Sequence, residues 1–143
     1  MFNPSREQVR RFFFDAWRRY RNGEPLAGLD VQAADIALMH PEYHPILNAP
    51  ERYLDREWTP EDGVTNPFLH MSMHLAIAEQ MSIDQPPGVH FAIEQLSVRS
   101  GDRHAAQHAA MECLGEMIWR AQRDGTPPDA TQYMACLQRS MRG

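Results

Sequence analysis

Aromatic and apolar residues near the N-terminus recur at the spacing of one helix face. They are Val9, Phe13, Trp17 and Tyr20, with Phe12 and Phe14 beside them. The pattern predicts a helix from about Pro4 to Arg21 that turns this stripe to the core and its arginines to solvent. Ser5 and Gln8 have the spacing of a capping box, and Gly23 stands where a helix stops. The arginine-rich back of this helix is either a solvated surface or a docking face.

The rest of the chain alternates helical periodicity with breaks rich in proline, and no segment shows strand alternation. A helix is predicted over residues 29–40, with Asp30 as its N-cap, and Pro41 ends it because a residue before proline leaves the helical region. Residues 41–65 are expected to form only short helical turns. Asn66 is the expected cap of the next helix. Further helices are predicted over residues 67–81, 89–98, 102–123 and 127–142.

These elements predict an all-α fold, a compact bundle of four main helices with short additional helices. A chain of 143 residues is long enough to bury a core as one domain, so a single domain over residues 1–143 is expected. The helix over residues 102–123 is expected to be central. Its apolar positions include Met111, Leu114, Ile118 and Trp119.

Composition indicates a soluble globular protein, because 43% of the residues are hydrophobic and 23% are charged. The first residues are too polar for a signal peptide, and no apolar run reaches the length that spans a membrane. Cys113 and Cys136 show no paired spacing, so neither a disulfide nor a redox or metal motif is expected. A reducing cytoplasm is the expected location.

Charge is unevenly distributed along the chain. Residues 1–23 hold six arginines against two acids, whereas residues 24–98 hold two arginines against twelve acids. An acidic middle argues against nucleic acid as the main partner. The partner is expected to be a protein or a small molecule, and the sequence does not set the oligomeric state.

Six of the seven histidines fall in pairs spaced by four residues: His40 with His44, His70 with His74, and His104 with His108. Residues four apart on a helix lie about 5–6 Å apart on one face, so two imidazoles can share one metal ion. The second and third pairs lie inside predicted helices. Each histidine of the first pair precedes a proline, so that pair is expected to straddle a helix end.

Carboxylates near these pairs extend the donor set. Glu112 follows His108 by four residues, and the other candidates are Glu42, Glu79 and Glu116. Two helical pairs with Glu112 would supply four nitrogens and one oxygen, which suits iron, zinc or manganese better than calcium or magnesium. Adding His40 or His44 and a second carboxylate would allow a dinuclear centre.

Two other interpretations of the histidines stay open. Histidines in helices also bridge neighbouring helices by hydrogen bonds or pair with glutamate. A catalytic histidine that needs no metal is the third alternative. No nucleophile elbow, Walker or dinucleotide-binding pattern occurs, so the sequence names no reaction.

Several strings resemble the family catalogued as domain of unknown function 1841. They are "MFNPSREQVRRFFFDAW", "HPEYH", "NPFLHMSMHLAIAEQMSIDQPPG" and "MECLGEMIWRAQRDGTPPD". The resemblance covers most of the chain and implies a small helical bacterial protein, with no activity. The histidine spacings are also similar in kind to helical metalloproteins of the hemerythrin type, an analogy of motif and not of fold.

Two hypotheses of function follow. In the first, the protein is a cytoplasmic metalloprotein with His70, His74, His104 and His108 as ligands and Glu112 as a ligand or base. In the second, it is a metal-free helical interaction module that binds a protein through the arginine-rich N-terminal helix or the acidic segment 41–65.

Overall fold

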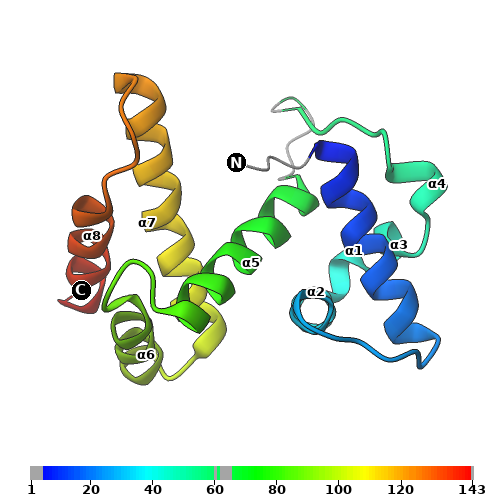
Figure 1. Cartoon of the computed structure of the whole chain (residues 1–143), viewed down its shortest axis with the longest axis horizontal. Coiled ribbons are helices and arrows are strands. Elements are labelled where there is room, and N and C mark those ends of the chain that lie inside the picture. The colour runs from blue at the N-terminus through cyan, green and yellow to red at the C-terminus, as the bar shows by residue number, and fades with distance from the viewer. Residues whose placement is uncertain (1–4, 60, 62–65, 143) are drawn as a thin grey trace. The chain divides into compact units, whose positions relative to one another are not determined.

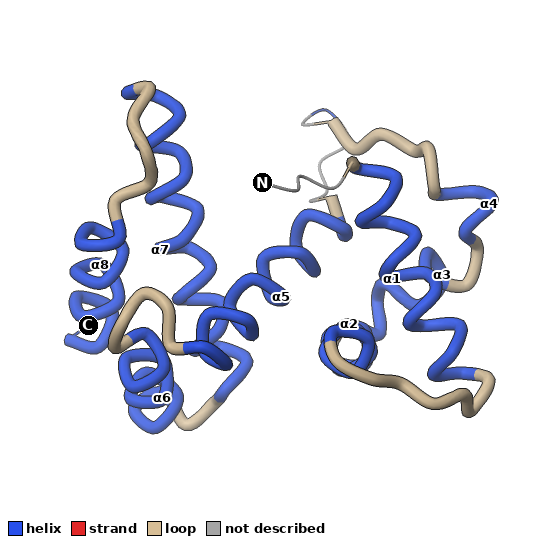
Figure 2. Tube along the Cα trace, in the orientation of Figure 1, coloured by secondary structure: helices blue, strands red, loops and turns tan. Residues whose placement is uncertain are grey.

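The computed structural model describes residues 5–59, 61 and 66–142, and these residues fold into helices and loops without a strand (Figures 1 and 2). The predicted all-α class is confirmed. The chain divides into two compact units, Met1–Leu75 (unit 1) and Ala76–Gly143 (unit 2). The division falls within one helix, α5 (Pro67–Ile83), which contributes its first half to unit 1 and its second half to unit 2. A single folding domain over the whole chain stays a prediction.

Unit 1 begins with the predicted aromatic helix, α1 (Arg6–Arg21). Its capping box is present, because the Ser5 hydroxyl accepts from the Gln8 backbone N–H and the Gln8 side chain accepts from the Ser5 backbone N–H. The predicted core stripe is confirmed, since Phe13 is 2% exposed and Trp17 is 6% exposed. Phe14 packs edge-on against Phe68 of α5, with ring centroids 5.3 Å apart. The hydrophobic face of α1 is therefore the core of unit 1.

The second helix, α2 (Leu29–Leu38), differs from its prediction at the N-terminus. Its N-cap is Gly28, whose φ of +60° suits glycine, and Asp30 lies inside the first turn. The assignment of Asp30 as N-cap was wrong. The Asp30 carboxylate instead accepts from Arg19 at 3.2 Å, which ties α2 to α1. In the first turn, the charge of Asp30 also suits the N-terminal end of the helix.

The segment after α2 forms only short helical turns, as predicted for its described part. These turns are η1 (Pro41–Tyr43), α3 (His44–Leu47) and α4 (Pro50–Tyr53). Each begins with or contains a proline in its first turn, where the missing N–H has no partner to lose. Residues 60 and 62–65 lie outside the described residues.

A buried arginine holds this irregular segment. Arg10 of α1 is 1% exposed, and its guanidinium donates to the backbone carbonyls of Tyr53, Leu54 and Arg56 at 3.2, 2.8 and 2.7 Å. Burial lowers the pKa of Arg10, and the charge of Arg6 lowers it further. Arg10 thus supplies hydrogen bonds that short helices leave unmade at their C-terminal ends.

Unit 2 contains the end of α5 followed by α6 (Val89–Ser100), α7 (Arg103–Asp124) and α8 (Ala130–Arg142). The expected cap at Asn66 starts α5, since its side-chain oxygen accepts from the Phe68 and Leu69 N–H groups. Asp102 caps α7 by accepting from the His104 N–H at 2.9 Å, and Gly125 ends that helix. The predicted helices of this half of the chain are confirmed to within a few residues.

The core of unit 2 is mostly aliphatic. Its buried side chains include Ile77, Val89, Ile93, Leu96, Met111, Leu114 and Leu137. Tyr133 of α8 is buried among them and donates its hydroxyl to the Gln80 side-chain oxygen of α5 at 2.6 Å. Trp119, which was predicted to face the core, is 56% exposed and lies under the Arg123 guanidinium at 4.8 Å.

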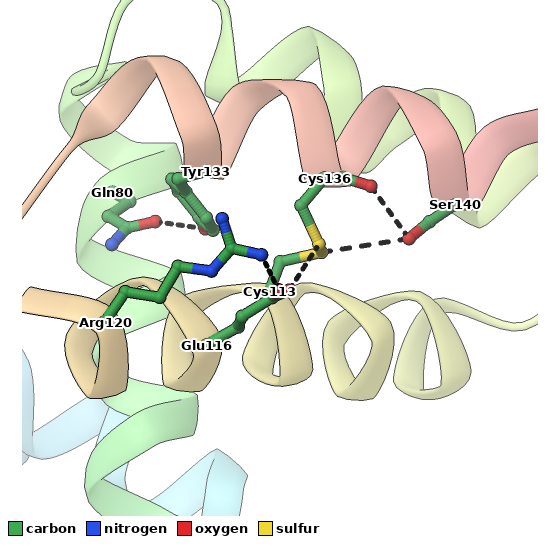
Figure 3. Close-up of a disulfide and its surroundings, with 7 residues drawn as sticks. All are labelled: Gln80, Cys113, Glu116, Arg120, Tyr133, Cys136 and Ser140. Atoms are coloured by element: carbon green, nitrogen blue, oxygen red, sulfur yellow. Dashed lines mark hydrogen bonds and ion pairs between the residues drawn. A yellow bond between two sulfur atoms is a disulfide. The ribbon is translucent and has the colours of Figure 1, made fainter. Parts of the chain in front are cut away.

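Cys113 of α7 and Cys136 of α8 form a disulfide (Figure 3). The prediction that the cysteines are unpaired was wrong, because packing of α7 against α8 brings together residues 23 positions apart in sequence. Disulfides are typical of oxidising compartments, so the argument for a reducing cytoplasm is lost. Within the described residues, no helix is long and apolar enough to span a bilayer.

Candidate metal centre

Three histidines of unit 1 meet where α2 ends beside the first half of α5. The ring centroids of His40 and His70 lie 4.9 Å apart, those of His40 and His74 4.7 Å, and those of His70 and His74 4.9 Å. His40 is 3% exposed and His74 is 2% exposed. The predicted pair on α5 therefore shares a buried cluster with the first histidine of another pair.

The local backbone explains how His40 reaches this position. His40 precedes Pro41 and has φ −128° and ψ 68°, which lies outside the helical region. Its ring turns back on α2, and Nδ1 lies 2.7 Å from the Ile36 carbonyl oxygen. A carbonyl only accepts, so Nδ1 carries the proton and Nε2 holds a lone pair.

This tautomer gives the cluster its chemistry. Nε2 of His70 lies 3.2 Å from Nε2 of His40, and a neutral His40 with its proton on Nδ1 accepts the His70 proton there. A histidine that ligates a metal characteristically donates its other ring N–H to a carbonyl or carboxylate, which fixes the ring. His40 shows this arrangement, with Nε2 as the ligating atom.

Tyr43 borders the same cluster, and the sequence did not single it out. Its ring stacks on His40 with centroids 5.2 Å apart and an interplanar angle of 8°, and it contacts His70 edge-on at 6.2 Å. Burial raises the pKa of Tyr43, and the charge of Glu42 raises it further. The phenol is therefore neutral at physiological pH. Its place within "HPEYH" was the only signal in the sequence.

Unit 2 contains the second helical pair. His104 and His108 lie one turn apart on α7, with ring centroids 4.3 Å apart, and both are partly buried. A ring nitrogen of each lies within 4.8 Å of the other, and the same limit holds for His40 and His74 in unit 1. Two nitrogens that share one transition-metal ion are up to about 4.2 Å apart, so small ring rotations suffice in either unit.

The remaining predicted ligands have other surroundings. The Nε2–H of His44 donates to the Ala37 carbonyl at 2.8 Å, and its ring stacks on Trp17 at 4.3 Å, a packing role. Glu112 and Glu79 are exposed on their helices, and so is Glu42 on η1. Glu116 pairs with Arg120 at 2.7 Å. Among the described residues, the donor atoms grouped closely enough to hold a metal are all imidazole nitrogens.

The fold and the site define an all-α, histidine-rich class of protein. The family model described as "Domain of unknown function (DUF1841)" matches residues 5–139, and the chain belongs to this family. No curated protein and no solved structure matches it. The resemblance seen in the sequence is confirmed, and the question of function rests on the histidines.

Proposed function

We propose that this protein binds a transition-metal ion through paired histidines. The proposed ligands are His40 and His74 within unit 1 and, as a separate pair, His104 and His108 within unit 2. The observation that carries the proposal is the hydrogen bond from His40 Nδ1 to the Ile36 carbonyl at 2.7 Å. It aims an imidazole lone pair at two further imidazoles in a buried place, the arrangement typical of ligating histidines.

The number of ligands limits what each pair can hold. A structural zinc site is four-coordinate, so two imidazoles fill half of it and water or other donors fill the rest. The pair on α7 offers the same two nitrogens in unit 2. His70 is a further candidate, since it already contacts His40. His44 and Glu112 stay predictions that their surroundings do not support.

The donor set restricts the metal and what it would do. Imidazole suits zinc and iron, whereas manganese prefers carboxylates, so zinc or iron is proposed ahead of manganese. Two nitrogens leave positions open in a tetrahedral or an octahedral site, so water or a small molecule could also coordinate the ion.

One observation favours the metal-free alternative. The 3.2 Å contact between His70 and His40 is a satisfied hydrogen bond between histidines, as expected of a polar core cluster. Trp17 is buried, so the aromatic stripe of α1 is core. The arginine-rich back of α1 and the acidic segment 41–65 stay the two candidate docking faces of the interaction module.

Elemental analysis of protein purified without a histidine tag tests the proposal. Near-stoichiometric zinc or iron is expected, with a chelator lowering the melting temperature, because a ligand of the native state stabilises it. His74→Ala should abolish binding at the pair in unit 1, and His108→Ala should abolish binding at the pair in unit 2. His90→Ala is the matched control, since His90 is exposed and belongs to no pair.

The variants also separate the alternatives. If the histidines form a polar core without metal, His74→Ala destabilises the protein by about 1–3 kcal/mol whether or not metal is present. If they are ligands, most of the penalty appears only in metal-loaded protein. Retention of wild-type metal content by His74→Ala would end the proposal.

A further inference from the structure

Unit 1 contains a cavity of about 540 Å³ that none of the histidines lines. One wall is α1, and the other is formed by α3, α4 and the residues that follow them. Its apolar floor consists of the buried rings of Phe14 and Trp17 together with Leu47. A volume of this size is typical of sites for small molecules.

The charged side chains that line the cavity from α1 are three arginines, Arg11, Arg18 and Arg21, and one acid, Asp15. Positions 11, 14, 18 and 21 follow the spacing of one helix face, so the charges stand beside the apolar floor. These arginines belong to the arginine-rich back of α1, which the sequence analysis interpreted as either a solvated surface or a docking face.

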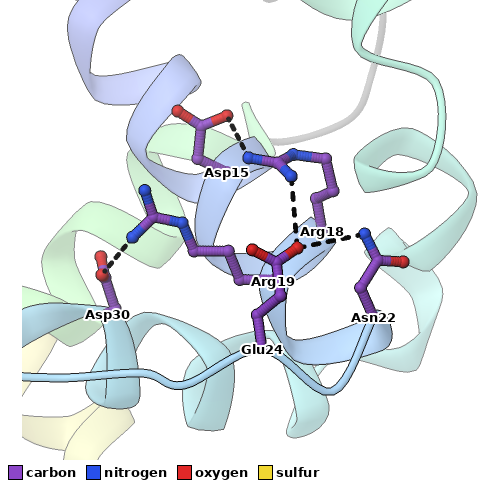
Figure 4. A network of polar contacts seen from close by, with 6 residues as sticks. All are labelled: Asp15, Arg18, Arg19, Asn22, Glu24 and Asp30. Atoms are coloured by element: carbon purple, nitrogen blue, oxygen red, sulfur yellow. Dashed lines mark hydrogen bonds and ion pairs between the residues drawn. The ribbon is translucent and has the colours of Figure 1, made fainter.

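Two of these arginines are neutralised by carboxylates. Arg11 pairs with Glu7 at 3.2 Å. Arg18 lies between Asp15 at 3.9 Å and Glu24 at 3.5 Å, as Figure 4 shows. These carboxylates offset most of the charge of Arg11 and Arg18.

Arg21 differs from both, because no carboxylate pairs with it among the described residues. One of its terminal nitrogens donates to the Asn48 side-chain oxygen at 2.6 Å, and the Trp17 indole N–H donates to the same oxygen at 2.8 Å. A neutral amide oxygen thus positions the guanidinium and leaves its charge and four of its five N–H donors for another acceptor.

We propose that this cavity binds a small organic anion, with a phosphate or carboxylate on Arg21 and an apolar body over Trp17 and Leu47. A planar guanidinium already held at one nitrogen can offer a bidentate pair of N–H groups to either anion. The apolar floor selects an organic ligand over a free inorganic ion. The site is independent of the proposed metal centre.

NMR titration of the full-length protein tests the proposal through the Trp17 indole N–H. Its hydrogen-bond acceptor is shared with Arg21, so an anion on Arg21 should shift this resonance. The probes are phenyl phosphate, benzoate and inorganic phosphate. Saturable shifts are expected with phenyl phosphate or benzoate. The probe that binds more tightly shows whether the site prefers a phosphate or a carboxylate.

Variants assign the binding to Arg21. Arg21→Gln should lower the affinity for the tighter-binding probe at least tenfold. Arg21→Lys keeps the charge but lacks the planar pair of N–H donors, so its affinity should fall less. Arg6→Gln is the control, because Arg6 lies on the same helix, is exposed and does not line the cavity. Its affinity should stay within twofold of wild type. An unchanged remainder of the spectrum shows that each variant folds.

Three results would overturn the inference. The first is an affinity unaffected by Arg21→Gln. The second is inorganic phosphate binding as tightly as phenyl phosphate, which would remove any role for the apolar floor. The third is no shift of the Trp17 resonance with any probe at about 10 mM, a concentration that saturates a millimolar site.

Discussion

The buried rings of unit 1 include Phe13, Phe14, Trp17 and Phe68, whereas Tyr133 is the aromatic side chain buried in the described core of unit 2. The two units also differ in the length of their helices. Unit 1 includes the short turns η1, α3 and α4, and unit 2 is made of longer helices. Large rigid rings fill space that short turns leave between them, while regular helices pack through aliphatic side chains.

Polar and covalent contacts follow the same division. In unit 1, Arg10 and Trp17 donate to acceptors 31 to 46 residues away and so fasten the irregular segment to α1. In unit 2, the Cys113–Cys136 disulfide and the Tyr133–Gln80 hydrogen bond join helices that already pack together. Unit 1 should therefore depend more on single side chains than unit 2 does.

The largest expected effect is that of Trp17→Ala, which should lower the free energy of unfolding by about 3–5 kcal/mol. The change removes a buried ring and leaves the Asn48 oxygen without its indole donor. Denaturant unfolding followed by circular dichroism measures it. Trp119→Ala is the matched control in unit 2 and should cost less than about 0.5 kcal/mol, because that ring is exposed. Equal effects of the two changes would contradict the comparison.

Reduction of the disulfide should have the next largest effect. Opening a loop closed across 23 residues should lower the free energy of unfolding by about 3 kcal/mol. Denaturant midpoints with and without a dithiol measure the difference, and amide exchange should quicken in α8 more than in α1. Cys136→Ser should make stability insensitive to the reductant. Two reactive thiols in the unreduced, denatured protein would show that the bridge does not form.

Tyr133→Phe should cost about 1 kcal/mol at neutral pH, because the Gln80 oxygen loses its donor. Burial raises the pKa of Tyr133 well above its usual value. The unfolded state loses this proton near pH 10 and the folded state keeps it, so the stabilisation is complete below about pH 10 and is lost as the pH rises further.

Unfolding curves between pH 8 and 12 test this dependence. Tyr133→Phe should lose part of the alkaline decline in stability, and Tyr20→Phe, a change at an exposed ring, should not. An identical decline in wild type and Tyr133→Phe would show that another group is responsible.

Most of the helix boundaries were predicted from the sequence. The capping box of Ser5 and Gln8, the cap at Asn66 and the stop at Gly125 all act within about one turn of the helix they delimit. The failure at Asp30 has a physical cause. The helix begins one residue earlier, at Leu29, because Gly28 takes the positive φ of +60° at the N-cap, so Asp30 falls inside the first turn.

The sequence predicted which histidines are candidate ligands, but it did not predict how their side chains are arranged. Spacing correctly indicated that His70 and His74, and likewise His104 and His108, share a helix face. The same spacing paired His40 with His44, but the two rings have different surroundings. The reason is that the helix ends before Pro41, so the two residues do not share a helix face.

The sequence by itself determined the all-α class, the helix ends and the buried stripe of α1, because periodicity and capping act over a few residues. Only the tertiary structure decided the contacts between distant residues. His40 meets His70 across 30 positions, Cys113 meets Cys136 across 23, and Arg10 reaches carbonyls more than 40 positions away. Such contacts depend on how helices pack, and packing depends on the shapes of many side chains at once.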